Sequence, residues 1–252
     1  MPKAPLKDFG FEKVDADTKT KRVQTLFDRV APSYDVMNDV MSFGLHRLWK
    51  ADFVANLPMP FKDTQPLRIL DLAGGTGDIS QRMLAKYGAL TEVVLTDLSE
   101  GMIQAGRNRD ASAAMHWVCG DGETLPFADH TFDLCTLVFG LRNMTHPEHV
   151  LADVFRVLKP GGTFHCLEFS AVTSPFLSGL YELYSFQLIP KFGRWIAKDE
   201  AAYRYLVESI RRFPSQQLLA DLMREVGFTK VSFENYVGGI AAVHQGAKDA
   251  IL

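Results

Sequence analysis

The sequence has few cysteines and no long hydrophobic run. Its 252 residues include 3 cysteines, which stand singly in apolar segments, so the sequence indicates neither a disulfide framework nor a cysteine-rich metal site. No apolar run approaches the roughly 20 residues that a membrane-spanning helix needs. Neither sign of charge is in large excess, because 27 Lys and Arg nearly balance 30 Asp and Glu. The lack of an overall positive charge argues against nucleic acid as a partner. No secretory leader is expected, and the odd cysteine count favours a reducing compartment.

What the sequence does contain is an alternation of short apolar runs and helical patterns. Hydrophobic residues make up 47% of the chain and charged residues 23%, as in soluble globular domains. Between residues 67 and 169, strand-like runs alternate with amphipathic helices, which predicts an α/β fold with a parallel, doubly wound sheet. Gly238-Gly239 predicts a hairpin between two closing strands. The expected strands span residues 67–72, 92–97, 115–119, 132–139, 163–169, 229–236 and 240–245.

The segments outside this alternation differ in character. Residues 1–20 are polar and predict a loosely held tail, and residues 21–252 predict a single domain. Within that domain we expect an N-terminal helical lid over residues 21–57 and a helical insertion over residues 174–213. The insertion is unusually aromatic between Phe176 and Trp195, which fits ordinary core or dimer packing as well as a channel for an apolar ligand.

A glycine-rich turn follows the first strand of the alternation and leads into a helix. In Asp71-Leu72-Ala73-Gly74-Gly75-Thr76-Gly77-Asp78, small residues let backbone N–H groups approach a ligand at the helix N-terminus. The dinucleotide pattern G-x-G-x-x-G does not fit, and the Gly-Lys-Ser/Thr of a P-loop is missing. The segment matches the acid-x-Gly-x-Gly-x-Gly turn of S-adenosylmethionine-dependent methyltransferases, with Asp71 as the acid and Ala73 in the first glycine position.

Two further acids stand where the next strands end. Asp97 closes the second strand, where a carboxylate can accept both hydroxyls of a ribose. Asp121-Gly122 follows the third strand and is placed to reach an adenine amino group. Each feature alone is compatible with tight packing or a helix cap. Their coincidence at successive strand ends predicts a bound nucleoside.

Several other segments carry a more specific pattern. They are Tyr34-Asp35-Val36-Met37-Asn38-Asp39-Val40-Met41-Ser42, Gly44-Leu45-His46-Arg47-Leu48-Trp49-Lys50, Phe139-Gly140-Leu141-Arg142-Asn143, Arg156-Val157-Leu158-Lys159-Pro160-Gly161-Gly162, Leu167-Glu168-Phe169-Ser170, Leu183-Tyr184-Ser185-Phe186 and Glu208-Ser209-Ile210-Arg211-Arg212-Phe213-Pro214. With these segments the chain resembles the quinone-biosynthesis C-methyltransferases of ubiquinone and menaquinone biosynthesis. That family methylates the ring of polyprenylated benzoquinols and naphthoquinols.

The resemblance implies a class I S-adenosylmethionine-dependent methyltransferase with a seven-stranded sheet and an antiparallel last strand. It also implies cofactor contacts at Thr76, Asp97 and Asp121-Gly122, and a further lining position at Val138, where this chain offers no hydroxyl. Together with the glycine turn, the cofactor-binding candidates are Asp71, Gly75, Thr76, Gly77, Asp97, Asp121, Gly122 and Val138.

The expected reaction needs neither a metal nor a covalent nucleophile, because a sulfonium methyl group is already activated. It needs a quinol carbon in line with the methyl group, exclusion of water, and help in removing a proton. The catalytic candidates are Arg142, which could stabilise a phenolate or act through water, Asn143, Tyr34 and His46. Ordinary packing remains an equal alternative for Tyr34 and His46. His146 and His149 lack a third ligand nearby in the sequence and predict a solvated helix face.

The acceptor and the cellular setting follow from the resemblance alone. It implies a polyprenylated methoxy-benzoquinol or demethylmenaquinol as substrate, peripheral contact with a membrane, and a homodimer or a quinone-biosynthesis complex. The expected place is the cytoplasm if the chain is bacterial and the mitochondrial matrix face of the inner membrane if it is eukaryotic. An O-methyltransferase or other small-molecule methyltransferase of this fold, and a non-catalytic scaffold, stay open as alternatives.

Overall fold

The computed structural model describes residues 5–30, 38–39, 42, 44–59, 66–88, 90–109, 112–173 and 200–250. The catalytic candidate Tyr34 and the aromatic stretch between Phe176 and Trp195 lie outside the described residues. None of the helices in these described ranges is both long and apolar enough to cross a membrane. The division of the chain into one domain with a lid and an insertion stays a prediction.

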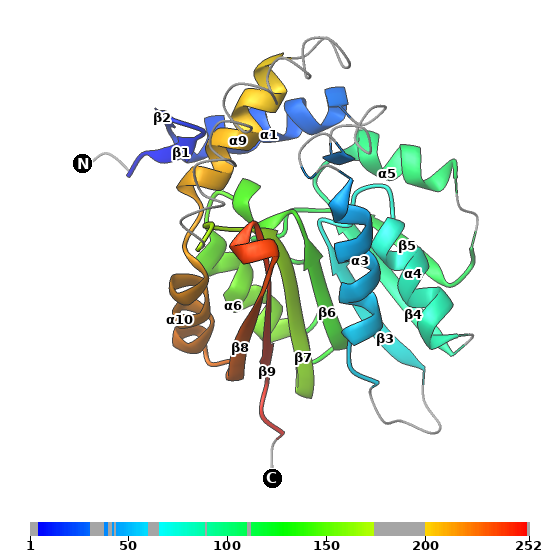
Figure 1. Ribbon diagram of the computed structural model, residues 1–252. Helices are drawn as coiled ribbons and strands as arrows, with labels where there is room; N and C mark the ends of the chain where they lie inside the picture. The colour runs from blue at the N-terminus through cyan, green and yellow to red at the C-terminus, as the bar shows by residue number, and fades with distance from the viewer. Residues whose placement is uncertain are drawn as a thin grey trace.

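A seven-stranded sheet forms the centre of the molecule, in the order β5-β4-β3-β6-β7-β9-β8 (Figure 1). Its first five strands along the chain pair in parallel, and the last strand runs antiparallel to both of its neighbours. The predicted class I architecture is therefore confirmed. The strands are β3 Leu67–Leu72, β4 Thr91–Asp97, β5 Met115–Cys119, β6 Phe132–Val138, β7 Leu158–Phe169, β8 Thr229–Tyr236 and β9 Ala241–Ala247.

Helices cover both faces of the sheet, because successive residues of a strand point to opposite sides. Ile69 of β3 belongs to the same buried cluster as Met83 of α4, whereas the next residue, Leu70, packs in the cluster that contains Leu151 of α6. Figure 1 shows α3 on one face, α6 and α10 towards the other, and α1 and α9 across one end of the sheet. The helices are α1 Ala16–Val30, α3 Leu45–Asn56, α4 Asp78–Tyr87, α5 Glu100–Arg107, α6 Pro147–Val157, α9 Glu200–Arg212 and α10 Gln216–Val226.

The structure corrects the predicted loose tail. Two short strands, β1 Lys7–Phe9 and β2 Glu12–Val14, form an antiparallel hairpin, and α1 begins at Ala16. The Asp15 carboxylate accepts the backbone N–H of Thr18 at 2.8 Å and so caps this helix. A contact distant in sequence holds the hairpin in place, because Glu208 of α9 accepts the N–H of Phe11 at 3.0 Å.

One strand begins earlier than the sequence predicts. The segment Lys159-Pro160-Gly161-Gly162 reads as a turn, but it lies inside β7, which already pairs with β6 at Leu158. A register shift between Phe132 and Leu134 accommodates the extra residues. Backbone hydrogen bonds from Lys248 after β9 hold the segment from the other side.

Candidate cofactor and acceptor site

The carboxyl ends of β3, β4, β5 and β6 border an open cleft of about 740 Å³. Ligands of doubly wound sheets bind at this edge, outside the carboxyl ends of the strands. Four of the predicted cofactor residues and one predicted catalytic residue line the cleft, namely Gly75, Asp97, Asp121, Gly122 and Asn143. The structure therefore brings together the strand-end residues that the sequence singled out.

A smaller pocket of about 390 Å³ adjoins the same glycine turn. Asp71, Thr76 and Val138 line it, and Gly75 lines both spaces. Gly77 lines neither. It precedes α4 with φ of +86°, and a Cβ at this position would lie 2.9 Å from the Trp117 ring, so its role is to start the helix and allow close packing.

Asp97 presents a half-buried carboxylate to the cleft. Its Oδ2 accepts the N–H of Gly75 at 2.9 Å and its Oδ1 accepts the N–H of Ser99 at 2.8 Å. Burial raises the pKa of Asp97 to about 6. Because each carboxylate oxygen can accept two hydrogen bonds, acceptor capacity remains for the hydroxyl groups of a ligand.

Asp71 is fully buried and serves the turn from within. Its carboxylate accepts the hydroxyl of Ser80 in α4 at 2.6 Å and that of Thr136 in β6 at 2.9 Å. Burial raises the pKa of Asp71 to about 6. Through these two hydrogen bonds the Asp71 side chain holds the glycine turn against α4 and β6.

Two residues at the cleft have strained backbones. Ala73, at the end of β3, has φ of +52°, and Phe139, at the end of the neighbouring β6, has φ of +57°. A Cβ on Gly140 would lie 2.6 Å from the Ala73 Cβ, so glycine is required there. Such strain concentrates at functional sites, where the surrounding fold holds it in place.

Arg142 has a packing role that the sequence did not predict. In η2, Leu141–Asn143, its Nη1 lies 2.6 Å from Oε1 of Glu168 and donates to the carbonyl of Phe139 at 2.7 Å. The guanidinium lies 5.3 Å from the centre of the Phe169 ring. Arg142 does not line the cleft, whereas Asn143 does, and the Asn143 Oδ1 accepts the hydroxyl of Tyr205 in α9 at 3.2 Å.

His46 is buried away from both spaces, with its Nδ1 3.0 Å from the Ser42 hydroxyl. Burial, reinforced by the charge of Lys50, lowers the pKa of His46 to about 4, so the ring is neutral at pH 7. Lys50, which was not among the predicted site residues, lines the smaller pocket with its Nζ 3.0 Å from Oδ2 of Asp78. In the sequence Lys50 is only a lysine next to Trp49 in a predicted helix. The helical pattern alone does not distinguish such a lysine from one that is exposed to solvent.

The first helix covers the open side of the cleft. It is attached to the loop after β4, because Asp28 accepts the hydroxyl of Ser99 at 2.5 Å. It is also attached to the loop before α6, because Lys19 Nζ donates to the carbonyl of Met144 at 2.7 Å. The cleft therefore lies between α1 and the strand ends.

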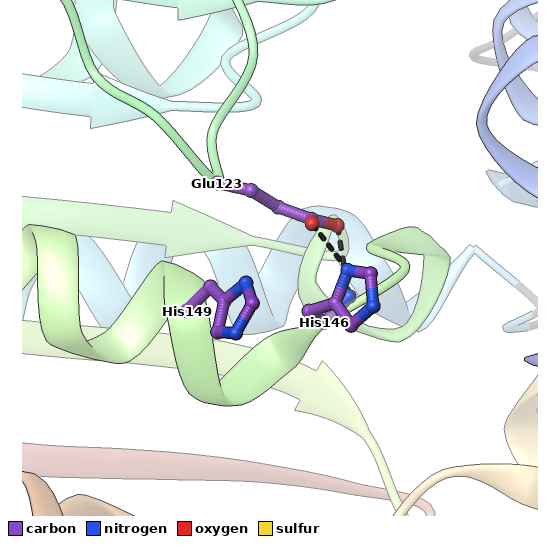
Figure 2. Close-up of side chains that lie close together, drawn as sticks. All are labelled: Glu123, His146 and His149. Atoms are coloured by element: carbon purple, nitrogen blue, oxygen red, sulfur yellow. Dashed lines mark hydrogen bonds and ion pairs between the residues drawn. The ribbon is translucent and has the colours of Figure 1, made fainter. Parts of the chain in front are cut away.

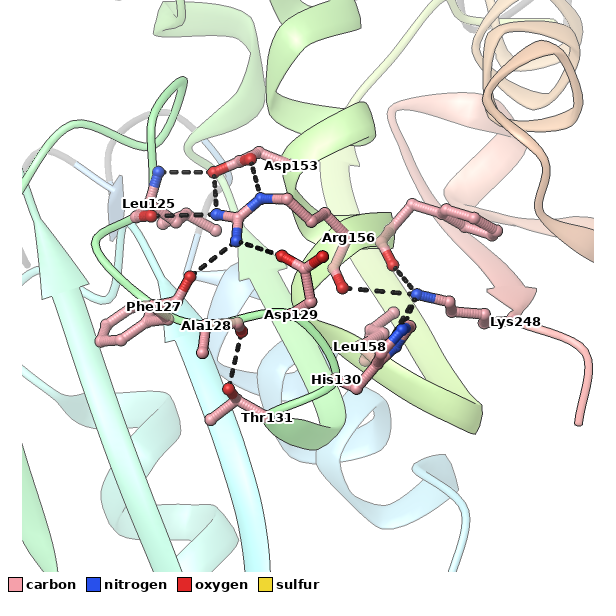
Figure 3. Close-up of polar contacts among 11 residues, drawn as sticks. Leu125, Phe127, Ala128, Asp129, His130, Thr131, Asp153, Arg156, Leu158 and Lys248 are labelled. Atoms are coloured by element: carbon pink, nitrogen blue, oxygen red, sulfur yellow. Dashed lines mark hydrogen bonds and ion pairs between the residues drawn. The ribbon is translucent and has the colours of Figure 1, made fainter. Parts of the chain in front are cut away.

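Arg156 of α6 anchors the loop between β5 and β6 (Figure 3). The Arg156 guanidinium donates to the carbonyls of Leu125 and Phe127 at 3.0 and 2.6 Å. It also forms ion pairs with Asp129 and Asp153. These contacts hold the part of the loop that follows the cleft-lining residues Asp121, Gly122 and Glu123.

Comparisons with known proteins agree with this geometry. The model of the ubiE/COQ5 methyltransferase family matches residues 15–248. The ubiquinone/menaquinone biosynthesis C-methyltransferase UbiE of Roseobacter denitrificans is 48% identical over 244 residues, which cover 95% of this chain and 96% of that protein. The mitochondrial 2-methoxy-6-polyprenyl-1,4-benzoquinol methylase of Danio rerio is 44% identical over 278 residues, covering 95% of this chain and 84% of that protein.

Solved structures share the fold at lower identity. The [4+2]-cyclase SpnF aligns with a TM-score of 0.67 and 17% identity, covering 92% of this chain and 97% of that chain. Phosphoethanolamine N-methyltransferase 2 of Haemonchus contortus, in complex with S-adenosyl-L-methionine, aligns with a TM-score of 0.59 and 15% identity, covering 80% of this chain and 52% of that chain. With the family model spanning the glycine turn, the strand-end acids and the closing hairpin, the chain belongs to the ubiE/COQ5 methyltransferase family.

Proposed function

We propose that this S-adenosylmethionine-dependent methyltransferase methylates a ring carbon of a polyprenylated methoxy-benzoquinol. The observation that supports this choice of methyl acceptor is the sequence similarity to relatives named for quinone biosynthesis. Two of them are 44% and 48% identical to this chain over nearly its whole length. The relatives' names also include menaquinone, so demethylmenaquinol is a second acceptor of the same chemistry.

The residues of the cleft fit S-adenosylmethionine. The cleft lies outside the carboxyl ends of the parallel strands, where doubly wound sheets bind nucleotides. Asp97 would accept the ribose hydroxyls, and Asp121 and Gly122 would meet the base, beside the apolar Met102. Thr76 and the Lys50 ammonium would hold the methionine end in the smaller pocket. When bound, the cofactor supplies a methyl group that is activated by its sulfonium.

The chain's own residues orient the acceptor and keep water out. Asn143 lines the cleft with its Oδ1 engaged by Tyr205, and its amide nitrogen is a donor suited to a quinol oxygen. A ring carbon becomes nucleophilic as the neighbouring hydroxyl shares or loses its proton, a step that general-base help accelerates by ~10²–10⁴-fold. The lid helix α1 excludes bulk water from this reaction.

Arg142 acts in this proposal as a positioning residue. A guanidinium stays protonated and cannot be the base itself. Through Glu168 and the Phe139 carbonyl it holds the η2 segment that carries Asn143.

Membrane contact and assembly remain part of the proposal. Leu6 and Phe11 of the N-terminal hairpin region are 58% and 48% exposed, which suits contact with a lipid surface. The Danio rerio relative is named mitochondrial, and the matrix face of the inner membrane would be the matching place in a eukaryote. A homodimer or a complex of quinone-biosynthesis enzymes would bring the lipid-bound acceptor to the cleft.

The test is to incubate the full chain with S-adenosylmethionine that carries a deuterated methyl group and with a reduced methoxy-polyprenyl-benzoquinol. Mass spectrometry with fragmentation then locates the label. A labelled methyl on the ring carbon is the expected result, and Asp97→Asn should give less label at limiting S-adenosylmethionine. A label on oxygen would replace the proposal by O-methylation. Cofactor binding without any label on the quinol would overturn it in favour of a different acceptor or a non-catalytic scaffold.

A further inference from the structure

Three side chains outside the proposed transfer chemistry converge at the edge of the cleft: Glu123, His146 and His149 (Figure 2). One ligand atom from each lies within 4.8 Å of those from the other two. His146 Nδ1 is 2.7 Å from Oε2 of Glu123, and the two imidazole rings stack with their centres 4.7 Å apart. The third group that the sequence lacked beside the histidines therefore comes from the loop after β5.

The fold itself brings these groups together. Glu123 follows β5, whereas His146 immediately precedes α6 and His149 lies in the first turn of that helix. The Glu123 Oε1 accepts the N–H groups of Thr145 and His146 at 2.6 and 2.8 Å, which fixes the carboxylate over the start of α6. Its negative charge offsets the positive end of the helix dipole, which would otherwise disfavour a cation.

We propose that Glu123, His146 and His149 bind a divalent transition-metal ion of the zinc class. Two imidazoles and one carboxylate suit Zn²⁺, Co²⁺ or Ni²⁺ better than the all-oxygen preference of Mg²⁺ or Ca²⁺. Three protein ligands with an open fourth position are a common zinc arrangement. This inference does not depend on the identity of the methyl acceptor.

Modest side-chain rotation completes the geometry. Ligand atoms about 2.0–2.2 Å from a tetrahedral ion lie roughly 3.3–3.6 Å apart, which is shorter than the present outer spacing. His149 is exposed and free to turn towards the pair, and the His146 and Glu123 side chains are 25% and 15% exposed, so the ion can reach them from solvent. Glu123 Oε2 can exchange its contact with His146 for the ion, while Oε1 keeps its two backbone donors.

The competing explanation is that Glu123 only caps α6 and pairs with His146. That explanation requires no contribution from His149, which makes this residue the decisive one. His149 does not line the cleft, so its substitution leaves the proposed cofactor contacts in place. His116, exposed in β5, provides a matched control because it lies outside the three-residue cluster.

The experiment uses the full chain without an affinity tag, titrated with Zn²⁺ by calorimetry and with Co²⁺ by visible absorption. We expect one ion per chain, with a Co²⁺ spectrum of nitrogen and oxygen ligands in a four-coordinate site. Loss of a second-shell partner of a metal ligand costs about 10–100-fold in affinity, so His149→Ala should cost at least about tenfold. His116→Ala should bind like the wild type.

Two further measurements keep the result interpretable. Circular dichroism and S-adenosylmethionine affinity of His149→Ala should match the wild type, which separates loss of a ligand from loss of the fold. Zn²⁺ should raise the melting temperature of the wild type more than that of His149→Ala. Equal affinity and equal stabilisation in the two proteins, or no stoichiometric binding by the wild type, would overturn the proposal.

Discussion

Arg142 and Glu168 form an ion pair from which water is almost completely excluded. Their side chains are 3% and 1% exposed, and the Glu168 Oε2 also accepts the backbone N–H of Arg142 at 3.2 Å. The pair joins η2, which follows β6, to the end of β7. An arginine beside the cleft is therefore a structural element of the sheet edge as well as a candidate for the chemistry.

Removing one member of this pair should be far more damaging than removing both. Arg142→Met or Glu168→Leu leaves a buried charge without its partner, which costs about 3–5 kcal/mol of unfolding free energy. The double variant Arg142→Met/Glu168→Leu should recover most of this loss, because an apolar pair of similar volume is often neutral or stabilising. Urea unfolding of the four proteins measures the difference.

The double variant also separates stability from chemistry. We expect it to bind S-adenosylmethionine like the wild type but to turn over well below it, because Asn143 loses the support of the Phe139 and Glu168 contacts. Wild-type turnover in a stably folded double variant would show that Arg142 has no part in the transfer.

Asp97→Asn should weaken S-adenosylmethionine binding while leaving the fold intact. The amide has the shape of the carboxylate but only one oxygen, so it cannot serve two ribose hydroxyls and two backbone N–H groups together. Hydrogen bonds to a charged group contribute about 1.5–3 kcal/mol, which corresponds to roughly 10–150-fold in dissociation constant. Calorimetry measures the dissociation constant, and Asp221→Asn in α10, whose side chain is half-exposed, is the matched control.

The same carboxylate should make cofactor affinity depend on pH. Burial raises the pKa of Asp97 to about 6, and ribose hydroxyls donate to the ionised form, so binding favours loss of the proton. Affinity should therefore be level above pH 7 and fall as the pH drops below about 6, by at most about tenfold per unit. Titrations between pH 5 and 8 test this, and a pH-independent affinity in the wild type would contradict the assignment of Asp97.

Ala73→Gly should stabilise the protein. An L-residue in the left-handed region costs about 1–2 kcal/mol, whereas glycine adopts φ of +52° freely. The greater freedom of glycine in the unfolded chain removes about 0.4–1 kcal/mol of this gain, which leaves roughly 0.5–1 kcal/mol. Ala51→Gly, exposed in the middle of α3, should have the opposite effect, and urea unfolding compares the two.

The sheet and the cleft at the strand ends were predictable because their signals are local. Short apolar runs in the sequence locate β3, β4, β5 and β6 to within about a residue. Asp97 ends the second of these runs, and Asp121 stands two residues after the third. Since parallel strands end at the same edge of a sheet, their convergence on one cleft follows from strand order alone.

The remaining features depend on contacts between residues distant in sequence. Glu208 lies far from Phe11 along the chain, and nothing in a polar N-terminal segment indicates that α9 will hold it as a hairpin. The partner of Arg142 becomes visible only when β7 is placed beside β6. The carboxylate beside His146 likewise belongs to another loop, so periodicity along α6 cannot reveal it.

The attachment of α1 to both rims of the cleft has a kinetic consequence. The helix is hydrogen-bonded to one rim through Asp28 and Ser99 and to the other through Lys19 and Met144. At least one of these contacts must break before a nucleoside can enter or leave the cleft. If the cofactor binds in the cleft as proposed, the spent cofactor would lie behind the same helix after each transfer. We expect release of the spent cofactor to be the rate-limiting step of turnover. Deuterium on the acceptor ring should then leave kcat unchanged, and Asp28→Ala, which loosens one rim, should raise it.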